Sequence, residues 1–303
     1  MNYFQPLLLF FIWAMPAGAA PPVTALAFSP DGKQILLASQ AGIAGFTFPG
    51  EKVLPRIPCS LTQVHDLSFS PDGKKLLAAG GSPGEEGSVE MLEWPGGKSL
   101  QRFHLHKDLV YRVAWSADGK LWATASGDGT CKVYSAEGQE ITRYQGHSRA
   151  VLTIAFFPGG KEVASGGMDG TIQIWDARTG KTSRTLDNHL KAVNDLVILA
   201  QGSGPPTLVS IGEDRTARLW HPAVGRMVRF VKLSSIPRTA AVAGGQILLG
   251  CNDGQVRALD AKSLELPGGK LALGGRIFSL AVSHDGAWVV VGGEGGMKAL
   301  PLP

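Results

Sequence analysis

Short segments in which apolar and polar residues alternate recur along the chain from residue 23 onwards. Residues 23–28, 64–69 and 110–115 are examples, and each is followed by a second apolar run that ends in small residues, as at 35–39 and 121–126. Alternation with a period of two predicts β-strands, and no long stretch shows the 3.6-residue period of an amphipathic helix. The pattern therefore predicts a protein built from many short strands.

Turn sequences separate these segments at regular places. A Ser-x-Asp-Gly sequence occurs four times and ends at Gly32, Gly73, Gly119 and Gly286. A second turn, often Asp-Gly, follows the next strand, and Asp-Gly favours two-residue hairpin turns because both residues tolerate positive φ. Each unit is therefore predicted to contain four antiparallel strands.

The units repeat seven times. The first β-branched residue of each leading strand is at position 23, 64, 110, 151, 193, 236 or 277, which gives spacings of 41, 46, 41, 42, 43 and 41 residues. Seven four-stranded units around one axis predict an all-β fold, a seven-bladed β-propeller. The third strand of the seventh unit, at 297–300, comes just before the last residues, so we expect three strands in that blade and ring closure by packing between blades.

The fourth unit carries motifs by which the chain resembles a known family. Gly146-His147 opens this unit, Asp169-Gly170-Thr171 forms its second turn, and Trp175-Asp176 closes its third strand. These residues and the repeat period resemble the WD40-repeat β-propeller family over residues 23–303. The resemblance implies a rigid scaffold for protein interactions that is not an enzyme and holds no cofactor.

The first 20 residues contain no charged side chain. An apolar run at 7–15 is followed by small residues at 17–20, with an Ala-x-Ala pattern at 17–19. This predicts a secretory signal peptide over 1–20 and a propeller domain over 21–303. A membrane anchor is the alternative, but the run is shorter than the roughly 20 residues that a span needs, and prolines interrupt it. We expect an exported protein, periplasmic or secreted, with no membrane span after signal removal.

Composition excludes several other classes. The 29 Lys and Arg residues and 25 Asp and Glu residues give a net charge of +4, but they are scattered, so a nucleic-acid partner is not expected. Three cysteines without a C-x-x-C pair exclude a disulfide framework and a zinc ribbon. No nucleotide-binding glycine motif and no H-E-x-x-H is present, so we expect no metal.

Three units share polar residues at constant spacing. The sets are His106, Thr124, Asp128 and Tyr134; His147, Ser165, Asp169 and Trp175; and His189, Ser210, Asp214 and Trp220. A Ser-His-Asp hydrolase uses the same residue types, but one active site is not expected in three copies. The family resemblance implies a buried hydrogen-bonded chain instead, in which the Tyr134 hydroxyl can replace the indole N–H as donor.

The other four units have no histidine at the equivalent position, and we expect apolar packing to hold them. The second unit also carries an insertion at 80–87, GGSPGEEG, which we expect to be a mobile loop. The alternative is that the acidic tip of this loop takes part in recognition of a partner.

The resemblance also implies where a partner binds. In similar proteins the contacts cluster beside the first residue of the leading strand and just before the turn aspartate. Carried over one by one, these positions are His65, Tyr111, Leu152, Met168, Asn194, Glu213 and Phe278. They mix aromatic, aliphatic and polar side chains, as interface centres do; the alternative is that some of them, Leu152 above all, only line the channel wall. The expected partner is a protein or peptide, with an exported redox protein as one candidate.

A propeller enzyme, such as a metal-dependent lactonase-like hydrolase, is the competing class. Such an enzyme needs carboxylates, Asn and His around a metal ion at the channel mouth. The candidates on the rim are Asn194, Glu213 and Asn252. Three polar residues are weak support for an active site, and a fold alone does not establish activity.

Overall fold

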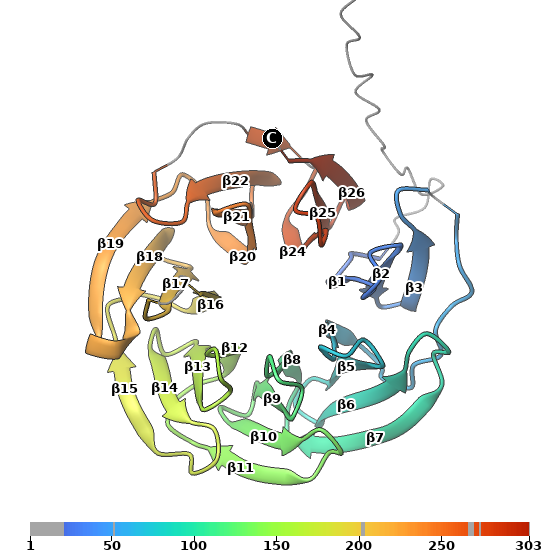
Figure 1. Cartoon of the computed structure of the whole chain (residues 1–303), viewed down its shortest axis with the longest axis horizontal. Coiled ribbons are helices and arrows are strands. Elements are labelled where there is room, and N and C mark those ends of the chain that lie inside the picture. Colours follow the sequence, from blue (N-terminus) through green and yellow to red (C-terminus); the bar gives the residue numbers. More distant parts are fainter. Residues whose placement is uncertain (1–20, 51, 201–203, 266–269, 273, 303) are drawn as a thin grey trace, which may run out of the picture.

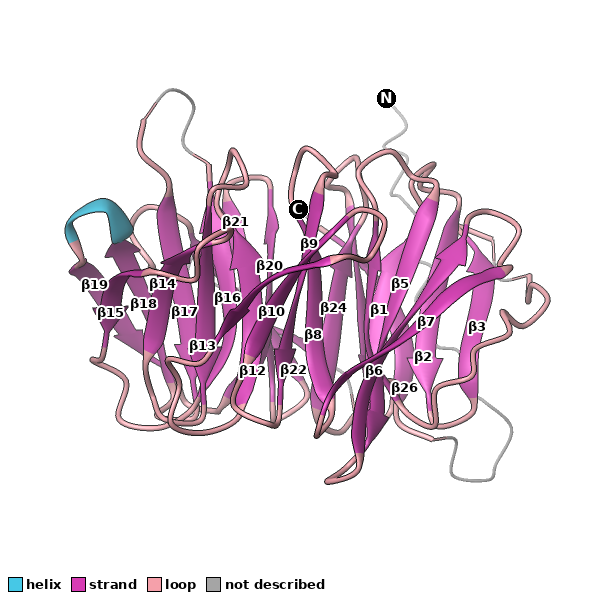
Figure 2. Cartoon of the chain, turned by 90° about the horizontal axis from the view of Figure 1, so that it is seen from below, coloured by secondary structure: helices cyan, strands magenta, loops and turns pink. Residues whose placement is uncertain are grey.

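Seven antiparallel sheets stand around a central axis, each like the blade of a propeller (Figure 1). The computed structural model describes residues 21–50, 52–200, 204–265, 270–272 and 274–302. Seen from the side, the strands run between the two faces of the disc, where the loops lie (Figure 2). The predicted all-β, seven-bladed propeller is confirmed. The expected signal peptide at 1–20 lies outside the described residues.

Five blades form four-stranded sheets. Blade two has β4 (Val64–Phe69), β5 (Lys75–Ser82), β6 (Glu86–Glu93) and β7 (Ser99–His106), and blade three has β8 (Val110–Trp115), β9 (Leu121–Ser126), β10 (Cys131–Ser135) and β11 (Glu140–Tyr144). Blade four has β12 (Val151–Phe156), β13 (Glu162–Gly167), β14 (Ile172–Asp176) and β15 (Thr182–Leu186), and blade five has β16 (Val193–Leu199), β17 (Thr207–Gly212), β18 (Thr216–His221) and β19 (Arg226–Lys232). Blade six has β20 (Pro237–Ala243), β21 (Gln246–Cys251), β22 (Gln255–Asp260) and β23 (Lys270–Ala272).

The first and seventh blades form three-stranded sheets. Blade one has β1 (Ala25–Phe28), β2 (Gln34–Ser39) and β3 (Gly42–Thr47), and blade seven has β24 (Ile277–Val282), β25 (Trp288–Gly293) and β26 (Gly296–Pro301). In blade one, Val53 and Ile57 form isolated bridges to Phe46 and Ile43 and so occupy the place of a fourth strand. Blade seven has three strands, as the sequence predicts.

The Ser-x-Asp-Gly turns have a common physical cause. In blade three the buried Ser116 hydroxyl donates to Asp118 Oδ1 at 2.7 Å, and the same oxygen accepts the Lys120 N–H at 3.1 Å. Gly119 follows with φ of 68°, in the left-handed region that favours glycine. The serine, the aspartate and the glycine of the motif therefore each stabilise the turn itself.

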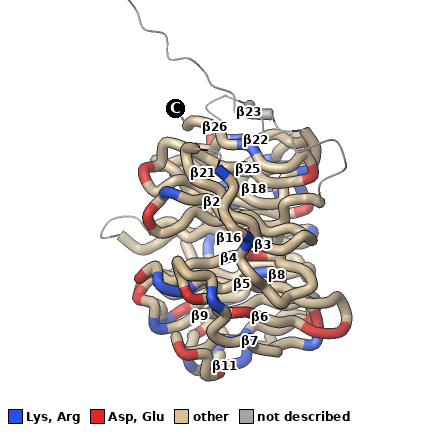
Figure 3. The backbone as a smooth tube through the Cα atoms, turned by 90° about the vertical axis from the view of Figure 1, so that its right-hand side faces the viewer, with Lys and Arg blue, Asp and Glu red and all other residues tan. Residues whose placement is uncertain are grey.

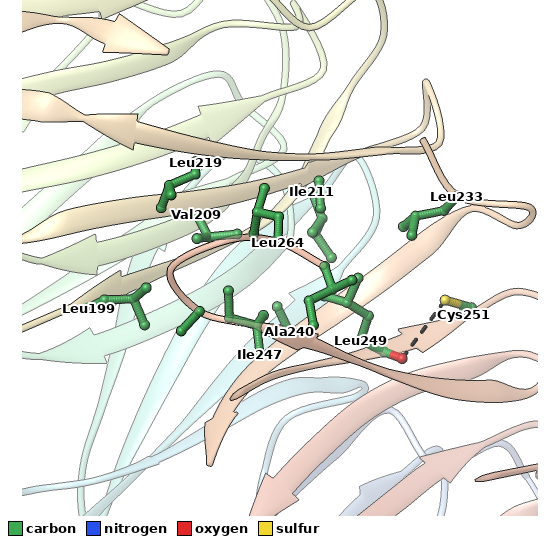
Figure 4. Packing of buried hydrophobic residues seen from close by; sticks show 13 residues of the cluster. Leu199, Val209, Ile211, Leu219, Leu233, Ala240, Ile247, Leu249, Cys251 and Leu264 are labelled. Atoms are coloured by element: carbon green, nitrogen blue, oxygen red, sulfur yellow. Dashed lines mark hydrogen bonds between the residues drawn. The ribbon is translucent and has the colours of Figure 1, made fainter. Parts of the chain in front are cut away.

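Buried apolar residues form seven clusters, one at each seam between neighbouring blades. Figure 4 shows the cluster between blades five and six, where Val209 and Leu219 face Ile247 and Leu249. The core is thus a ring of seams that hold the sheets at fixed angles. No helix in the described ranges is long and apolar enough to cross a bilayer.

The ring closes where blade seven meets blade one. An apolar cluster that includes Leu26 and Val290 fills this seam. The Val23 N–H donates to the Gly293 carbonyl at 3.1 Å, and the Leu26 N–H donates to Ser279 Oγ at 3.0 Å. No further strand pairs with β26 within the described part of the chain. Packing therefore closes the ring together with two hydrogen bonds that the sequence did not predict.

Two local expectations were wrong. Residues 80–87 are not a separate loop, because β5 and β6 continue their pairing through Gly80↔Ser88 and Ser82↔Glu86. In blade six the leading position is Pro237 and not residue 236, since Pro237 pairs with Cys251 as Ile277 pairs with Gly293 in blade seven.

Candidate functional site

The polar sets of blades four and five form complete buried chains. In blade four, His147 donates from Nδ1 to Asp169 Oδ2 at 3.0 Å and accepts at Nε2 from Ser165 Oγ at 2.9 Å, and Trp175 Nε1 donates to Ser165 at 3.1 Å. This assignment of the imidazole protons is the one that satisfies every partner. The matching distances in blade five are 3.0, 2.7 and 2.8 Å, among His189, Asp214, Ser210 and Trp220.

Blade three has an incomplete chain, so the expectation for Tyr134 was wrong. His106 bonds to Asp128 at 3.0 Å and to Thr124 at 2.8 Å, but the buried Tyr134 hydroxyl has no hydrogen-bond partner among the described residues. Tyr134 pairs with Trp122 across the strands and stacks on it at 4.2 Å. A phenol carries its hydroxyl at the tip of the ring, whereas an indole N–H lies at the side, so the tyrosine hydroxyl does not replace the indole N–H as a donor to Thr124.

These chains also position the loops on one face of the disc. Asp128, Asp169 and Asp214 accept, besides the imidazole, the backbone N–H of the residue after the histidine. Burial raises the pKa of the three carboxyls, but hydrogen bonds from the histidine and a threonine outweigh burial and hold each pKa well below its usual range. The His106, His147 and His189 side chains are at most 1% exposed, so they touch nothing outside the protein.

Blades two and six contain polar contacts where apolar packing alone was expected. In blade two the buried Glu90 accepts from the Ser60 N–H and hydroxyl, at 2.7 and 2.8 Å. In blade six the buried Arg257 donates to Asp253 Oδ2 at 2.6 Å, which raises the pKa of Arg257. These contacts were not predicted from the sequence, because the pattern used to predict polar contacts contains a histidine and neither of these contacts does.

A β-bulge near the start of the innermost strand shapes the channel mouth. The pairing register shifts at this point in blades two to seven. The residues in the bulge are His65, Tyr111, Leu152, Asn194, Arg238 and Phe278. Because a bulge redirects a side chain, it turns these residues toward the channel axis.

All seven residues expected on the rim line one pocket, of about 340 Å³, at the channel mouth. Thr24 and Arg238, which are not among the rim positions predicted from the sequence, line it as well. Arg238 was missed because Pro237 replaces the β-branched residue that marks the other strands. The position of the turn Asn252-Asp253, used in place of a β-branched marker, identifies Arg238.

Aromatic side chains occupy part of this pocket. His65 and Tyr111 meet edge to face at 5.7 Å between ring centroids, and the Arg276 guanidinium lies 5.9 Å from the Phe278 ring. Burial lowers the pKa of His65 and raises the pKa of Tyr111. His65 Nε2 is buried without a hydrogen-bond partner among the described residues, so a bound group could supply one.

A charged layer lies below the mouth. Arg112 on β8 lies 3.6 Å from Asp66 on β4 and 3.5 Å from Asp195 on β16. Asp195 also accepts from Thr153 Oγ1 at 2.9 Å and from the Ala240 N–H at 3.0 Å, so it links blades four, five and six. Asp66 and Arg112 line both the mouth pocket and a second channel pocket of about 430 Å³. The sequence does not reveal this layer, because its members lie in three separate units.

The candidates for a metal site have protein partners. Arg238 Nε donates to Asn252 Oδ1 at 2.8 Å, and its Nη1 lies 3.5 Å from Glu213 Oε1. Asn194 Nδ2 donates to the Pro237 carbonyl at 2.8 Å. The described residues contain no group of three or more His, Cys, Asp or Glu side chains that could hold a metal ion. The two histidines of β7 have different partners, since His104 Nδ1 lies 2.7 Å from Glu86 Oε2 and the buried His106 bonds to Asp128.

Comparison with known proteins agrees with the strand pattern. The family model described as "WD domain, G-beta repeat" matches residues 97–135 and 138–176. The first segment includes the polar set of blade three, and the second includes that of blade four. No curated protein matches the chain.

Proposed function

Because this chain is a seven-bladed β-propeller with WD40 repeats, we propose that it is a non-enzymatic scaffold that binds a protein or peptide partner at the channel mouth, in an exported compartment. The observation that carries the proposal is the convergence of seven side chains, from five blades, on one pocket. Five of the seven lie at bulges of the inner strands, and the other two, Met168 and Glu213, lie in the turns after β13 and β17. Their mixed chemistry is that of an interface centre.

Two observations favour a scaffold over an enzyme. The Ser165 and Ser210 hydroxyls are fully buried and bonded to both imidazole and indole, so neither meets a substrate. At the mouth, the guanidinium of Arg238 lies beside Glu213 and Asn252, and a positive charge there opposes a metal cation.

The proposal of export rests on the apolar run and Ala-x-Ala pattern within residues 1–20. The thiols suit an oxidising compartment. Cys131 and Cys251 are buried and Cys59 is half-buried, and burial raises the pKa of Cys59 and of Cys251 to about 11. Thiols with such pKa values form little thiolate and resist oxidation.

The test replaces two aromatic side chains of the mouth in Tyr111→Ala, Phe278→Ala. Proteins captured by the wild type from the exported fraction are identified by mass spectrometry, and their affinity is then measured with purified components. We expect the double variant to bind at least about tenfold more weakly, because aromatic residues at interface centres contribute most of the binding energy.

The matched control is Val228→Ala, Phe230→Ala, which removes exposed side chains from the outer strand β19. This control is expected to bind like the wild type. If the mouth variant binds its partners unchanged while its urea unfolding curve stays that of the wild type, the mouth is not the binding site.

A further inference from the structure

A groove between blades four and five continues the channel mouth outward. It has a volume of about 430 Å³, and its walls include Arg149, Met168, Leu190 and Lys191. Met168 and Glu213 line both this groove and the mouth pocket. A chain segment that enters the mouth therefore has a continuous path across blades four and five.

The groove presents apolar side chains to solvent. Leu190 is 87% exposed, the highest value among the large hydrophobic side chains of the described residues, and Met168 is 36% exposed. An exposed apolar pair within a polar rim is typical of an interaction site.

The free charges of the groove are positive. Arg149 and Lys191 are exposed, and neither forms an ion pair within the described part of the chain. Arg149 makes only a long contact, of 3.4 Å, to the Met168 carbonyl. The two carboxylates that line the groove are already engaged, since Asp169 accepts from His147 and Glu213 lies beside Arg238.

The loops that carry these side chains are held by the buried polar chains. The Ser148 N–H, beside Arg149, donates to Asp169 at 3.0 Å. The Leu190 N–H, beside Lys191, donates to Asp214 at 3.2 Å. A groove fixed in this way binds with a smaller loss of conformational entropy than a loose loop does.

We propose that this groove binds an extended acidic segment of the partner, with carboxylates on Arg149 and Lys191 and one apolar side chain on Leu190 and Met168. The inference rests on the proposed scaffold function and names its partner class. A nucleic acid fits less well, because only two free cations line the groove. On the side of the disc drawn in Figure 3, charges of both signs are interleaved as well.

The experiment uses an array of random peptides of about nine residues, which span about 30 Å when extended. The labelled wild-type protein is expected to select peptides enriched in Asp and Glu around one large apolar residue. Affinities of the selected peptides are then measured by fluorescence anisotropy. The variant Arg149→Glu, Lys191→Glu is expected to bind them at least about tenfold more weakly, because like charges repel across the interface.

The control is Arg178→Glu, Lys181→Glu, which reverses two exposed charges in the loop between β14 and β15 and is expected to bind within about twofold of the wild type. A selection without acidic enrichment, or peptides bound equally by the groove variant, would overturn the inference. So would a labelled oligothymidine that binds in an Arg149- and Lys191-dependent manner while the peptides do not.

The two proposals fail separately. If Tyr111→Ala, Phe278→Ala abolishes capture of the native partner but the groove variant does not weaken it, the scaffold function is supported. The proposal that the groove binds an acidic segment is then wrong. If neither variant changes capture, both fall.

Discussion

At position 134 a tyrosine stands where blades four and five carry tryptophan, and its buried hydroxyl has no partner among the described residues. Tyr144 offers a direct comparison, because this residue is also buried and its hydroxyl bonds to Gln173 at 3.2 Å and to Thr182 at 3.0 Å. An unpaired buried hydroxyl costs free energy that a paired one does not.

Removing the hydroxyl should therefore act oppositely at the two positions. Tyr134→Phe is expected to leave the free energy of unfolding unchanged or to raise it by about 1 kcal/mol, whereas Tyr144→Phe lowers it by about 1 kcal/mol. Urea unfolding measures both. A loss for Tyr134→Phe as large as that for Tyr144→Phe would show that the first hydroxyl has a bonded partner after all.

Single residues were predictable where a motif repeats and hidden where it does not. The histidine, hydroxyl and aspartate positions follow from constant spacing in three units. Arg112, Asp66 and Asp195 carry no such signal, because a charge on an inner strand reveals its partner only when the ring brings three blades together. Tyr134 shows that residue type alone does not fix where a hydroxyl points.

At the scale of elements, blades three to five share a dependence on ionised aspartate. Hydrogen bonds hold the pKa of Asp128, Asp169 and Asp214 below the unfolded value, although burial opposes this. A carboxyl with a lowered folded-state pKa stabilises the fold fully above the unfolded pKa, near 4. That contribution is lost as the pH falls from about 4 toward the folded-state pKa.

We therefore expect the free energy of unfolding to begin to fall below about pH 5 and to fall most steeply below about pH 4. Asp169→Asn should lose about 1–3 kcal/mol at pH 7 and show a shallower fall toward low pH, because it removes one of the titrating carboxyls. Urea unfolding at a series of pH values measures both effects. The control Asp187→Asn, at an exposed position, should keep the wild-type slope. An equal slope for Asp169→Asn and the wild type would contradict the assignment.

Strands and turns followed from the sequence because alternation and Ser-x-Asp-Gly act locally. Two elements were misjudged for reasons that are also local. In blade six the start of the leading strand was misplaced because Pro237 is not β-branched. In blade two the glycines at 80–87 indicated a loop, although Gly80, Gly81 and Gly87 continue the pairing of β5 with β6.

At the scale of the whole molecule, the number of blades was predictable from the period, but the closing contacts were not. The hydrogen bond from Leu26 to Ser279 joins residues 253 positions apart, and no local pattern encodes such a contact. Gly292 lies in the same seam, and a Cβ atom there would come within 2.6 Å of Val23 Cγ1 and 3.0 Å of Leu26 Cδ1.

Gly292→Ala should therefore strain the closing seam and lower the free energy of unfolding by about 1–3 kcal/mol, as overpacking does. Hydrogen exchange followed by mass spectrometry should show the loss of protection first in β1 and β25. Gly274→Ala is the control, since a Cβ there meets no atom within 4 Å. Uniform loss of protection over all seven blades would show that the seam between blades seven and one is not a separate weak point.

The bulges on the inner strands have one more consequence. Each adds a residue that the regular pairing of the sheet does not need, so the side chain at that position can be exchanged without repacking the seams behind it. Randomising Tyr111, Leu152, Asn194, Arg238 and Phe278 together would therefore yield a combinatorial library on a constant frame. Variants with new binding preferences could be selected from this library, and all of them would keep the propeller fold.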